Sequence, residues 1–359
     1  MSELEQKLTR ISDLLERRSL DALYLSRISS FAWATCGAAS YINTATTTGE
    51  ASLLITRSGR YMITNNIEAP HYEKEEGLKD QGWEFVIHPW FEGSDALQRY
   101  AGGMKIGADT ALPGAADLSA ELAEMRMNLL PEEHERYRKV SRLTADALEA
   151  AVRATRPGMA EYEIAGLIAK ECFDRAVLPI VNLIATDERI YGFRHPLPAD
   201  KKRLDKYAML IVCGRKYGLV TSCTRLVHFG PLPDDLKKKQ NAVVNIDAQV
   251  IAATRTGASL GDMFSVIQRA YADNGYPEEY RLHHQGGSAG YEPREFIATP
   301  GTAVQVRTGQ AYAWNPSITG VKVEDTVLIT ETGPEVMTEM PDWPMIETES
   351  IKRPAILEM

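Results

Sequence analysis

The segment ATRPG at residues 154–158 returns as ATRTG at residues 253–257, and each copy lies between two helical patterns. MAEYEIAGLIAKECFDRA follows the first copy and ASLGDMFSVIQRAYADNG follows the second, with Glu163 and Asp262 at matching positions. A β-rich stretch then follows each helix pair. Two matching α-then-β halves predict a domain with pseudo-twofold symmetry, and we expect a functional site in the cleft where the halves meet.

The chain before this repeat predicts a smaller α/β domain. Residues 3–18 alternate apolar and charged residues at helical spacing, and DALYLSR at 21–27 is a strand candidate. Residues 29–64 are β-branched, aromatic and punctuated by glycine, which is typical of strands and turns. We place the domains at 1–128 and 129–359 and predict the α+β fold class.

The composition limits the partners and the location of the protein. The 359 residues include 40 basic and 49 acidic side chains, a formal net charge of -9, which argues against a general affinity for nucleic acid or anionic membranes. We find neither a secretory signal nor an apolar run long enough to span a bilayer. The four cysteines form no CxxC pair and fit a reducing compartment. A cytoplasmic protein with a small-molecule substrate is the expectation.

One short motif is a false lead. Residues 257–261, GASLG, match the GxSxG pattern of a nucleophile elbow. An elbow follows a strand, whereas a helical pattern precedes this segment. Ser259, followed three residues later by Asp262, is instead typical of a residue that caps the start of a helix.

Three of the seven histidines lie in unusual surroundings. His195 is in the proline-rich and charged loop FRHPLPADKK, and His283 and His284 are in the glycine-rich segment RLHHQGGSAGYEPRE. A neutral imidazole is the commonest proton-transfer group near neutral pH, although a lone histidine is more often structural. The remaining four are expected to be surface or packing residues: His71, His88, His134 and His228.

Four segments of the second domain occur in a fixed order: RPGMAEYEIA at 156–165, RHPLP at 194–198, GRKYGLVTSCTRLVHFG at 214–230 and VKVEDTVLIT at 321–330. In this order and spacing they resemble the pita-bread family, which includes creatinase, aminopeptidase P, prolidase and methionine aminopeptidase. The resemblance covers roughly residues 130–335, and the first domain is similar to the N-terminal domain of creatinase and prolidase. It implies a C-terminal pita-bread domain.

The ligand positions of the family are largely lost. Peptidases of this family hold two divalent cations with two aspartates, one histidine and two glutamates. The matching positions here are Val212, Ser222, His284, Asn315 and Glu324. A pair of dications needs several anionic oxygens, so the comparison implies a site without metal or other cofactor.

Creatinase, which also lacks the two aspartates, is the family precedent for hydrolysis without metal. By that resemblance His195 is the catalytic base and then the acid, Glu324 orients the nucleophile or a cationic substrate, and His284 bonds the substrate. The residues expected to bind the substrate are Tyr291, Arg294, Asn315, Ser222 and Arg225. Tyr291 stands where the family has a second histidine. Arg294 is one residue away from the position that matches a carboxylate-binding arginine of creatinase.

Three functions are compatible with this pattern. The first is a metal-independent, creatinase-like hydrolase that cleaves a C–N bond in a small amidino, ureido or amide substrate. The second is a pseudoenzyme that only binds a small molecule. The third is an Xaa-Pro-type peptidase with one metal ion held by His284, Glu324 and Asn315.

Two further expectations concern the cysteines and the first domain. Neighbouring strand residues point to opposite faces, so Cys213 and Cys223 should point away from Val212 and Ser222 into the core. The resemblance also implies a homodimer in which the first domain of one chain caps the cleft of the other. A run of aromatic and polar residues could either form that cap or belong to the domain core: Phe31, Trp33, Tyr41 and Asn43.

Overall fold

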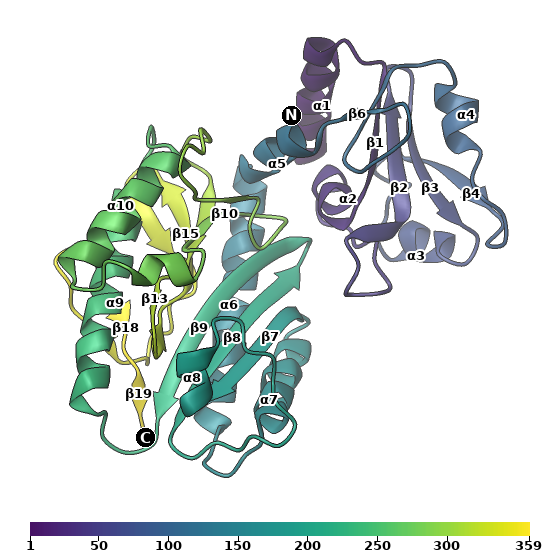
Figure 1. Cartoon of the computed structure of the whole chain (residues 1–359). Coiled ribbons are helices and arrows are strands. Elements are labelled where there is room, and N and C mark those ends of the chain that lie inside the picture. The colour runs from purple at the N-terminus through teal and green to yellow at the C-terminus, as the bar shows by residue number, and fades with distance from the viewer. The chain divides into compact units, whose positions relative to one another are not determined.

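The sequence forms two units in a computed structural model that describes residues 1–359. Met1–Arg126 make up the first unit and Met127–Met359 make up the second (Figure 1). No helix is both long enough and apolar enough to cross a membrane.

The first unit contains a six-stranded mixed sheet in the order β4-β3-β2-β1-β5-β6. Its strands are β1 (Ala22–Arg27), β2 (Thr48–Thr56), β3 (Arg60–Asn65), β4 (Glu84–His88), β5 (Ile106–Ala108) and β6 (Ala116–Asp117). The accompanying helices are α1 (Glu3–Arg18), α2 (Ile28–Ala34), α3 (Ala69–Lys74), α4 (Ala96–Ala101) and α5 (Ser119–Met127). Phe31 and Trp33 are fully buried, so these two aromatic residues belong to the core.

The second unit contains two larger sheets. Strands β7 (Leu178–Thr186), β8 (Tyr207–Lys216), β9 (Leu219–His228) and β19 (Leu357–Glu358) form the first, in the order β19-β9-β8-β7. The second has the order β11-β10-β12-β15-β16 and consists of β10 (Gly286–Ala289), β11 (Phe296–Ile297), β12 (Ala311–Trp314), β15 (Asp325–Thr330) and β16 (Gly333–Val336). Two short ladders pair β13 (Ser317–Ile318) with β14 (Val321–Lys322) and β17 (Met345–Ile346) with β18 (Arg353–Pro354).

The helices of the second unit repeat as the sequence predicts. They are α6 (Pro131–Ala154), α7 (Glu161–Asp174), α8 (Glu188–Gly192), α9 (Asp234–Ala253), α10 (Leu260–Asp273) and a 3-10 turn, η1 (Glu279–Leu282). The residues before α7 and α10, Ala160 and Ser259, each form an isolated bridge, to Arg203 and Gln305. Ser259 accepts a hydrogen bond from the backbone of Asp262, which confirms the capping role and excludes a nucleophile elbow.

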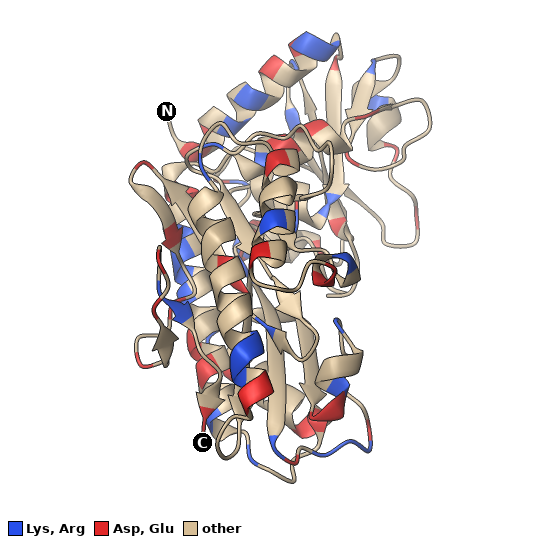
Figure 2. Ribbon diagram, turned by 60° about the vertical axis from the view of Figure 1, so that its left-hand side comes forward, with Lys and Arg blue, Asp and Glu red and all other residues tan.

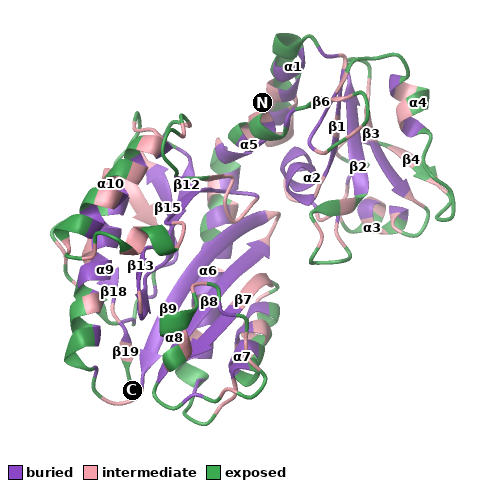
Figure 3. Cartoon of the chain, in the orientation of Figure 1, coloured by how far each residue is buried: buried purple, intermediate pink, exposed green.

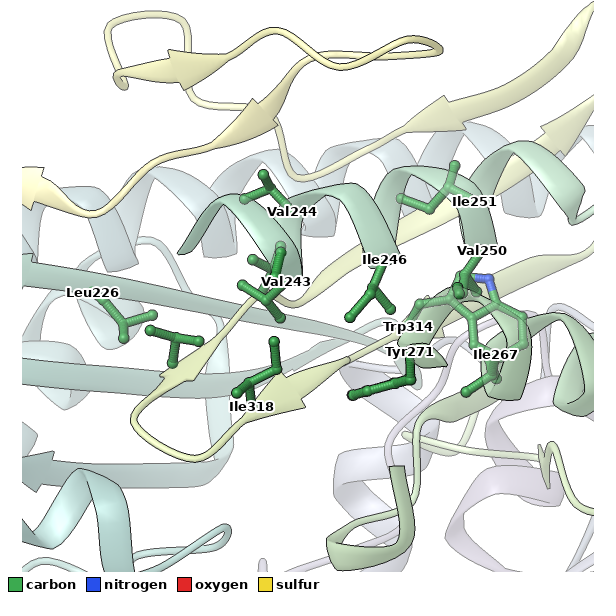
Figure 4. Packing of buried hydrophobic residues seen from close by; sticks show 14 of the residues in the cluster. Leu226, Val243, Val244, Ile246, Val250, Ile251, Ile267, Tyr271, Trp314 and Ile318 are labelled. Atoms are coloured by element: carbon green, nitrogen blue, oxygen red, sulfur yellow. The ribbon is translucent and has the colours of Figure 1, made fainter. Parts of the chain in front are cut away.

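A buried apolar cluster lies between these helices and the sheets. Figure 4 shows residues of α9 (Val243, Ile246 and Val250) facing Trp314 and Ile318. The helices expose their outer faces, while the strands of this unit are mostly buried (Figure 3). Basic residues (blue in Figure 2) and acidic residues (red) are both spread over the helices and loops. The core therefore holds the two halves of the repeat together as one body of packed layers.

The two sheets of the second unit meet where β9 passes the start of β15. Thr224 and Glu324 form an antiparallel bridge, in which the Thr224 N–H donates to the Glu324 carbonyl at 3.1 Å. Two residues before Thr224 on β9, the Ser222 N–H donates to Oγ1 of Thr326 on β15 at 2.9 Å. This seam places side chains from both halves of the repeat next to each other.

Candidate functional site

Three histidines from two distant segments gather in the second unit. Nε2 of His195 lies 2.9 Å from Nε2 of His283, and the rings of His283 and His284 stack with their centroids 4.4 Å apart. One ring nitrogen from each residue lies within 4.8 Å of the other two. The side chain of His195 is exposed, so the cluster is open to solvent on that side.

Local contacts fix the loop that carries His195. The Ile184 N–H on β7 donates to the Pro196 carbonyl at 3.1 Å, which attaches the loop to the sheet. Arg194 forms an ion pair with Glu279 at 2.7 Å. Because Glu279 belongs to η1, just before His283, this pair links the two segments that carry the histidines.

Glycines hold the segment that follows His284. Gly286 has a φ of 109°, a conformation that favours glycine. A Cβ on Gly286 would lie 2.1 Å from the Ala313 carbonyl oxygen, and one on Gly287 would lie 2.0 Å from the Phe296 carbonyl oxygen. The glycine-rich motif of this loop is therefore a requirement of close strand pairing between β10 and its two neighbours.

Beside the cluster, one carboxylate is paired with two cations. Glu324 contacts Lys322 Nζ at 3.1 Å and Arg294 Nη2 at 3.0 Å. Thr224 donates to the same carboxylate at 2.6 Å. Burial on its own would raise the pKa of Glu324, but the two cations and the hydrogen bonds outweigh it and hold the pKa at about 2. Glu324 is thus an anion at neutral pH, and with Lys322 and Arg294 it leaves one net positive charge.

The three imidazoles are neutral beside this charge. Burial, and next the Lys322 cation, lower the pKa of His195, and the same two effects lower that of His283 to about 2. Burial and the Arg294 cation lower the pKa of His284 to about 4. Each ring therefore keeps one nitrogen lone pair that can accept a proton or a hydrogen bond at neutral pH.

The strand register changes which residue lies opposite Ser222. β8 and β9 are joined by a two-residue turn, Tyr217–Gly218, which pairs Cys213 with Ser222 and Val212 with Cys223. Cys213 Sγ lies 3.2 Å from Ser222 Oγ. Directly paired residues share a face of a sheet. Cys213 therefore points away from its neighbour Val212, as expected, but the register puts it on the same face as Ser222.

Cys213 is nevertheless unsuited to act as a nucleophile. Burial raises the pKa of its thiol to about 11, so the thiolate is scarce at neutral pH. Cys223, on the other face, points toward Asp325, with its sulfur 3.8 Å from Oδ1. That placement agrees with the expectation that Cys223 points away from Ser222.

The predicted substrate-binding residues fall into two groups. Arg294 and Ser222 are brought together, since Arg294 Nη1 donates to Ser222 Oγ at 3.1 Å. Asn315 is buried beside the histidine segment, where its N–H donates to the Gln285 carbonyl at 3.1 Å and its Oδ1 has no hydrogen-bond partner. These three residues fit a position at the site.

Tyr291 and Arg225 are held elsewhere. The Tyr291 hydroxyl donates to Glu133 Oε1 on α6 at 2.6 Å, and the side chain is buried. Arg225 donates to Asp325 Oδ1 at 2.9 Å and to the Thr338 carbonyl at 3.0 Å, with 3% of its side chain exposed. Arg225 follows Thr224 on the strand and so lies on the opposite face. The structure gives both residues structural contacts and does not bring either to the histidines.

The donor set does not fit the metal pair of the family. Of the matching positions, only Glu324 supplies a carboxylate, and it is already neutralised by Arg294 and Lys322. Ser222, the next position, accepts a hydrogen bond from Arg294. A pair of dications in this place would face two side-chain cations and a single carboxylate, which is too little anionic charge to hold them.

Lys322 and the pairing of Cys213 were missed by the sequence interpretation. Lys322 and Glu324 are two residues apart on an extended segment, and this spacing puts two side chains on one face. The alternation VKVE at 321–324 was therefore the available signal for Lys322. His283 was singled out with His284 but was given no role, and its place in the cluster comes from the fold.

Comparison with known proteins identifies the family of this chain. The family model for metallopeptidase family M24 matches residues 135–331. An uncharacterized peptidase of Staphylococcus haemolyticus is 25% identical over 231 residues, which cover 62% of this chain and 65% of the relative. The match therefore spans less than two thirds of that relative's length.

Two solved structures show the same fold. The prolidase of Pyrococcus horikoshii OT3 has a TM-score of 0.79 and 19% identity, covering 96% of this chain and 100% of that one. The Xaa-Pro dipeptidase of Bacillus anthracis has a TM-score of 0.77 and 19% identity, covering 99% and 100%. The predicted pita-bread family and the α+β arrangement are confirmed. Since the family model matches more than half of its residues, this chain belongs to metallopeptidase family M24.

Proposed function

We propose that this chain hydrolyses a C–N bond in a small substrate without the two metal ions of the family. The observation that carries the proposal is the pairing of Glu324 with Lys322 and Arg294. The two side-chain cations take the electrostatic place of a metal pair beside the one remaining carboxylate. A buried cation next to a reacting carbonyl stabilises negative charge that develops there, as a metal ion would.

The proposed chemistry begins at His195. Its Nε2 shares a hydrogen bond with His283, so in the tautomer in which His195 donates, its Nδ1 has a free lone pair. This nitrogen takes a proton from water while the water oxygen attacks the carbonyl carbon. Lys322 donates to the oxygen that becomes negative. The C–N bond then breaks, and His195 returns the proton to the leaving nitrogen.

The substrate class is a separate part of the proposal. Two structural neighbours are named as a prolidase and an Xaa-Pro dipeptidase, and this favours an Xaa-Pro dipeptide over the amidino or ureido compound expected from the sequence. Both classes carry a carboxylate, which suits the net positive charge of the site. We therefore place Xaa-Pro dipeptides first and small amidino, ureido and amide acids second.

Turnover of a substrate panel tests the proposal. Chelator-treated protein is incubated with Xaa-Pro dipeptides and, separately, with the second class, and release of the free amine is followed. We expect hydrolysis of at least one class, with His195→Ala inactive and His88→Ala, a variant outside the site, as active as the wild type. Equal activity of the His195→Ala protein would overturn the role of His195.

A binding-only protein is the second candidate, because three of the four anionic ligand positions have changed to neutral residues. Ligands from the same panel that raise the melting temperature, yet give no product, would support it.

A peptidase with one metal ion at His284, Glu324 and Asn315 predicts activity that requires added metal. A homodimer and a cytoplasmic location remain proposals, and a mass measurement in solution tests the first.

A further inference from the structure

We propose that His195, His283 and His284 form a binding site for one transition-metal ion of the zinc, nickel or copper type. This ligand set differs from the carboxylate-rich set of the family and shares only the position of His284. One nitrogen from each ring lies within 4.8 Å of the others. Metal–nitrogen bonds of about 2.0–2.1 Å in tetrahedral geometry place ligand nitrogens about 3.3 Å apart, so side-chain rotations have to close the present spacing to bring all three onto one ion.

Two nitrogens of the cluster are open to coordination. Nδ1 of His283 and Nδ1 of His284 are buried and have no hydrogen-bond partner. A buried polar atom without a partner costs free energy, which a bound ligand recovers. This observation is independent of the distances between the rings, and it points to a ligand for the same two residues.

The nitrogen ligands of the cluster decide which ions it accepts. Lys322 and Arg294 occupy both sides of Glu324, so no free carboxylate remains for a hard ion such as magnesium or calcium. The repulsion from these two cations is the same for every dication. The preference of imidazole nitrogen therefore determines the selectivity, and it favours zinc, nickel and copper.

Such an ion would inhibit the protein. Coordination uses lone pairs of the three imidazoles, including that of His195, which would then be unable to take a proton from water. This consequence rests on the proposed function, whereas the binding of the ion does not.

Calorimetric titration of the full-length, chelator-treated protein tests the site, with zinc chloride or magnesium chloride alone as the probe. We expect one zinc ion per chain and no magnesium. Loss of an outer-sphere partner weakens metal binding by about 10–100-fold. Each of the three ligand variants should weaken zinc binding by at least that much: His195→Ala, His283→Ala and His284→Ala. His88→Ala should bind zinc as the wild type does. Circular dichroism verifies that each variant is folded.

Three results would overturn the site. The first is zinc binding that survives both His195→Ala and His283→Ala. The second is zinc binding that is lost in Glu324→Gln but kept in the histidine variants. The third is magnesium that binds as tightly as zinc. The titration contains no substrate. If the proposed hydrolysis fails, the zinc-binding result therefore still stands. Zinc that binds as expected but does not slow turnover would reject only the inhibitory role.

Discussion

Lys322 and Glu324 lie two residues apart and pair through Nζ and Oε2 at 3.1 Å, with 5% and 4% of their side chains exposed. A buried carboxylate without a partner is strongly unfavourable, and here Lys322 shares its neutralisation with Arg294. The positive charges beside Glu324 are thus carried by side chains of this protein.

Lys322→Met should destabilise the protein. Removal of one partner from a buried pair leaves an undercompensated charge, and we expect a loss of about 3 kcal/mol in the free energy of unfolding. The double variant Lys322→Met/Glu324→Gln should lose less than the sum of its single changes. Chemical denaturation measures both. The control is Lys352→Met, whose exposed pair with Glu347 should leave stability nearly unchanged. Similar losses for both lysine variants would contradict the buried-pair interpretation.

Acid should remove the stabilisation that Glu324 provides. Its pKa is held at about 2 in the folded chain, below the ordinary value of 4.5, so its contribution is fully present above pH 4.5. That contribution is lost as the pH falls from about 4.5 toward 2, and it amounts to at most about 3 kcal/mol. Unfolding followed against pH in the wild type and in Glu324→Gln should differ in this window. Parallel curves there would refute the low pKa.

His195→Ala should lower kcat by about 10²–10⁴, the usual range for loss of a general base. The side chain is exposed and its loop is held by Arg194 and Pro196, so the melting temperature should change little. Steady-state kinetics on the active substrate class, with thermal unfolding as the fold control, provides both numbers. A large drop in melting temperature would show that the residue is structural.

Two glycine variants separate close packing from helix propensity. Gly287→Ala places a Cβ 2.0 Å from the Phe296 carbonyl oxygen, so it should destabilise the protein by about 3 kcal/mol or more. Gly166→Ala, within α7 and with open space around it, should stabilise the protein by about 0.5–1 kcal/mol. Thermal or urea unfolding reports both signs. Destabilisation by Gly166→Ala would show that α7 packs differently.

The sequence was sufficient to predict the repeat and the gathering of the histidines. ATRPG and ATRTG mark the ends of α6 and α9, since these patterns of apolar spacing and capping are local. The resemblance brought His195 and His284 to one site, although the residues are far apart along the chain.

The motifs alone did not predict which residues of neighbouring strands share a face of the sheet at the site. A one-residue change in the hairpin between β8 and β9 reverses which side chains share a face, and the register depends on the turn at Tyr217 and Gly218. Both turn residues have positive φ, 56° and 72°. This register places Cys213 opposite Ser222.

Hydrolysis by chelator-treated protein tests the central claim most directly. The wild type, dialysed against a strong chelator and verified as metal-free by elemental analysis, is assayed on Xaa-Pro dipeptides and on small amidino, ureido and amide acids. The account predicts turnover that survives the chelator and disappears in His195→Ala. Turnover that disappears with the chelator and returns with manganese or cobalt would contradict it.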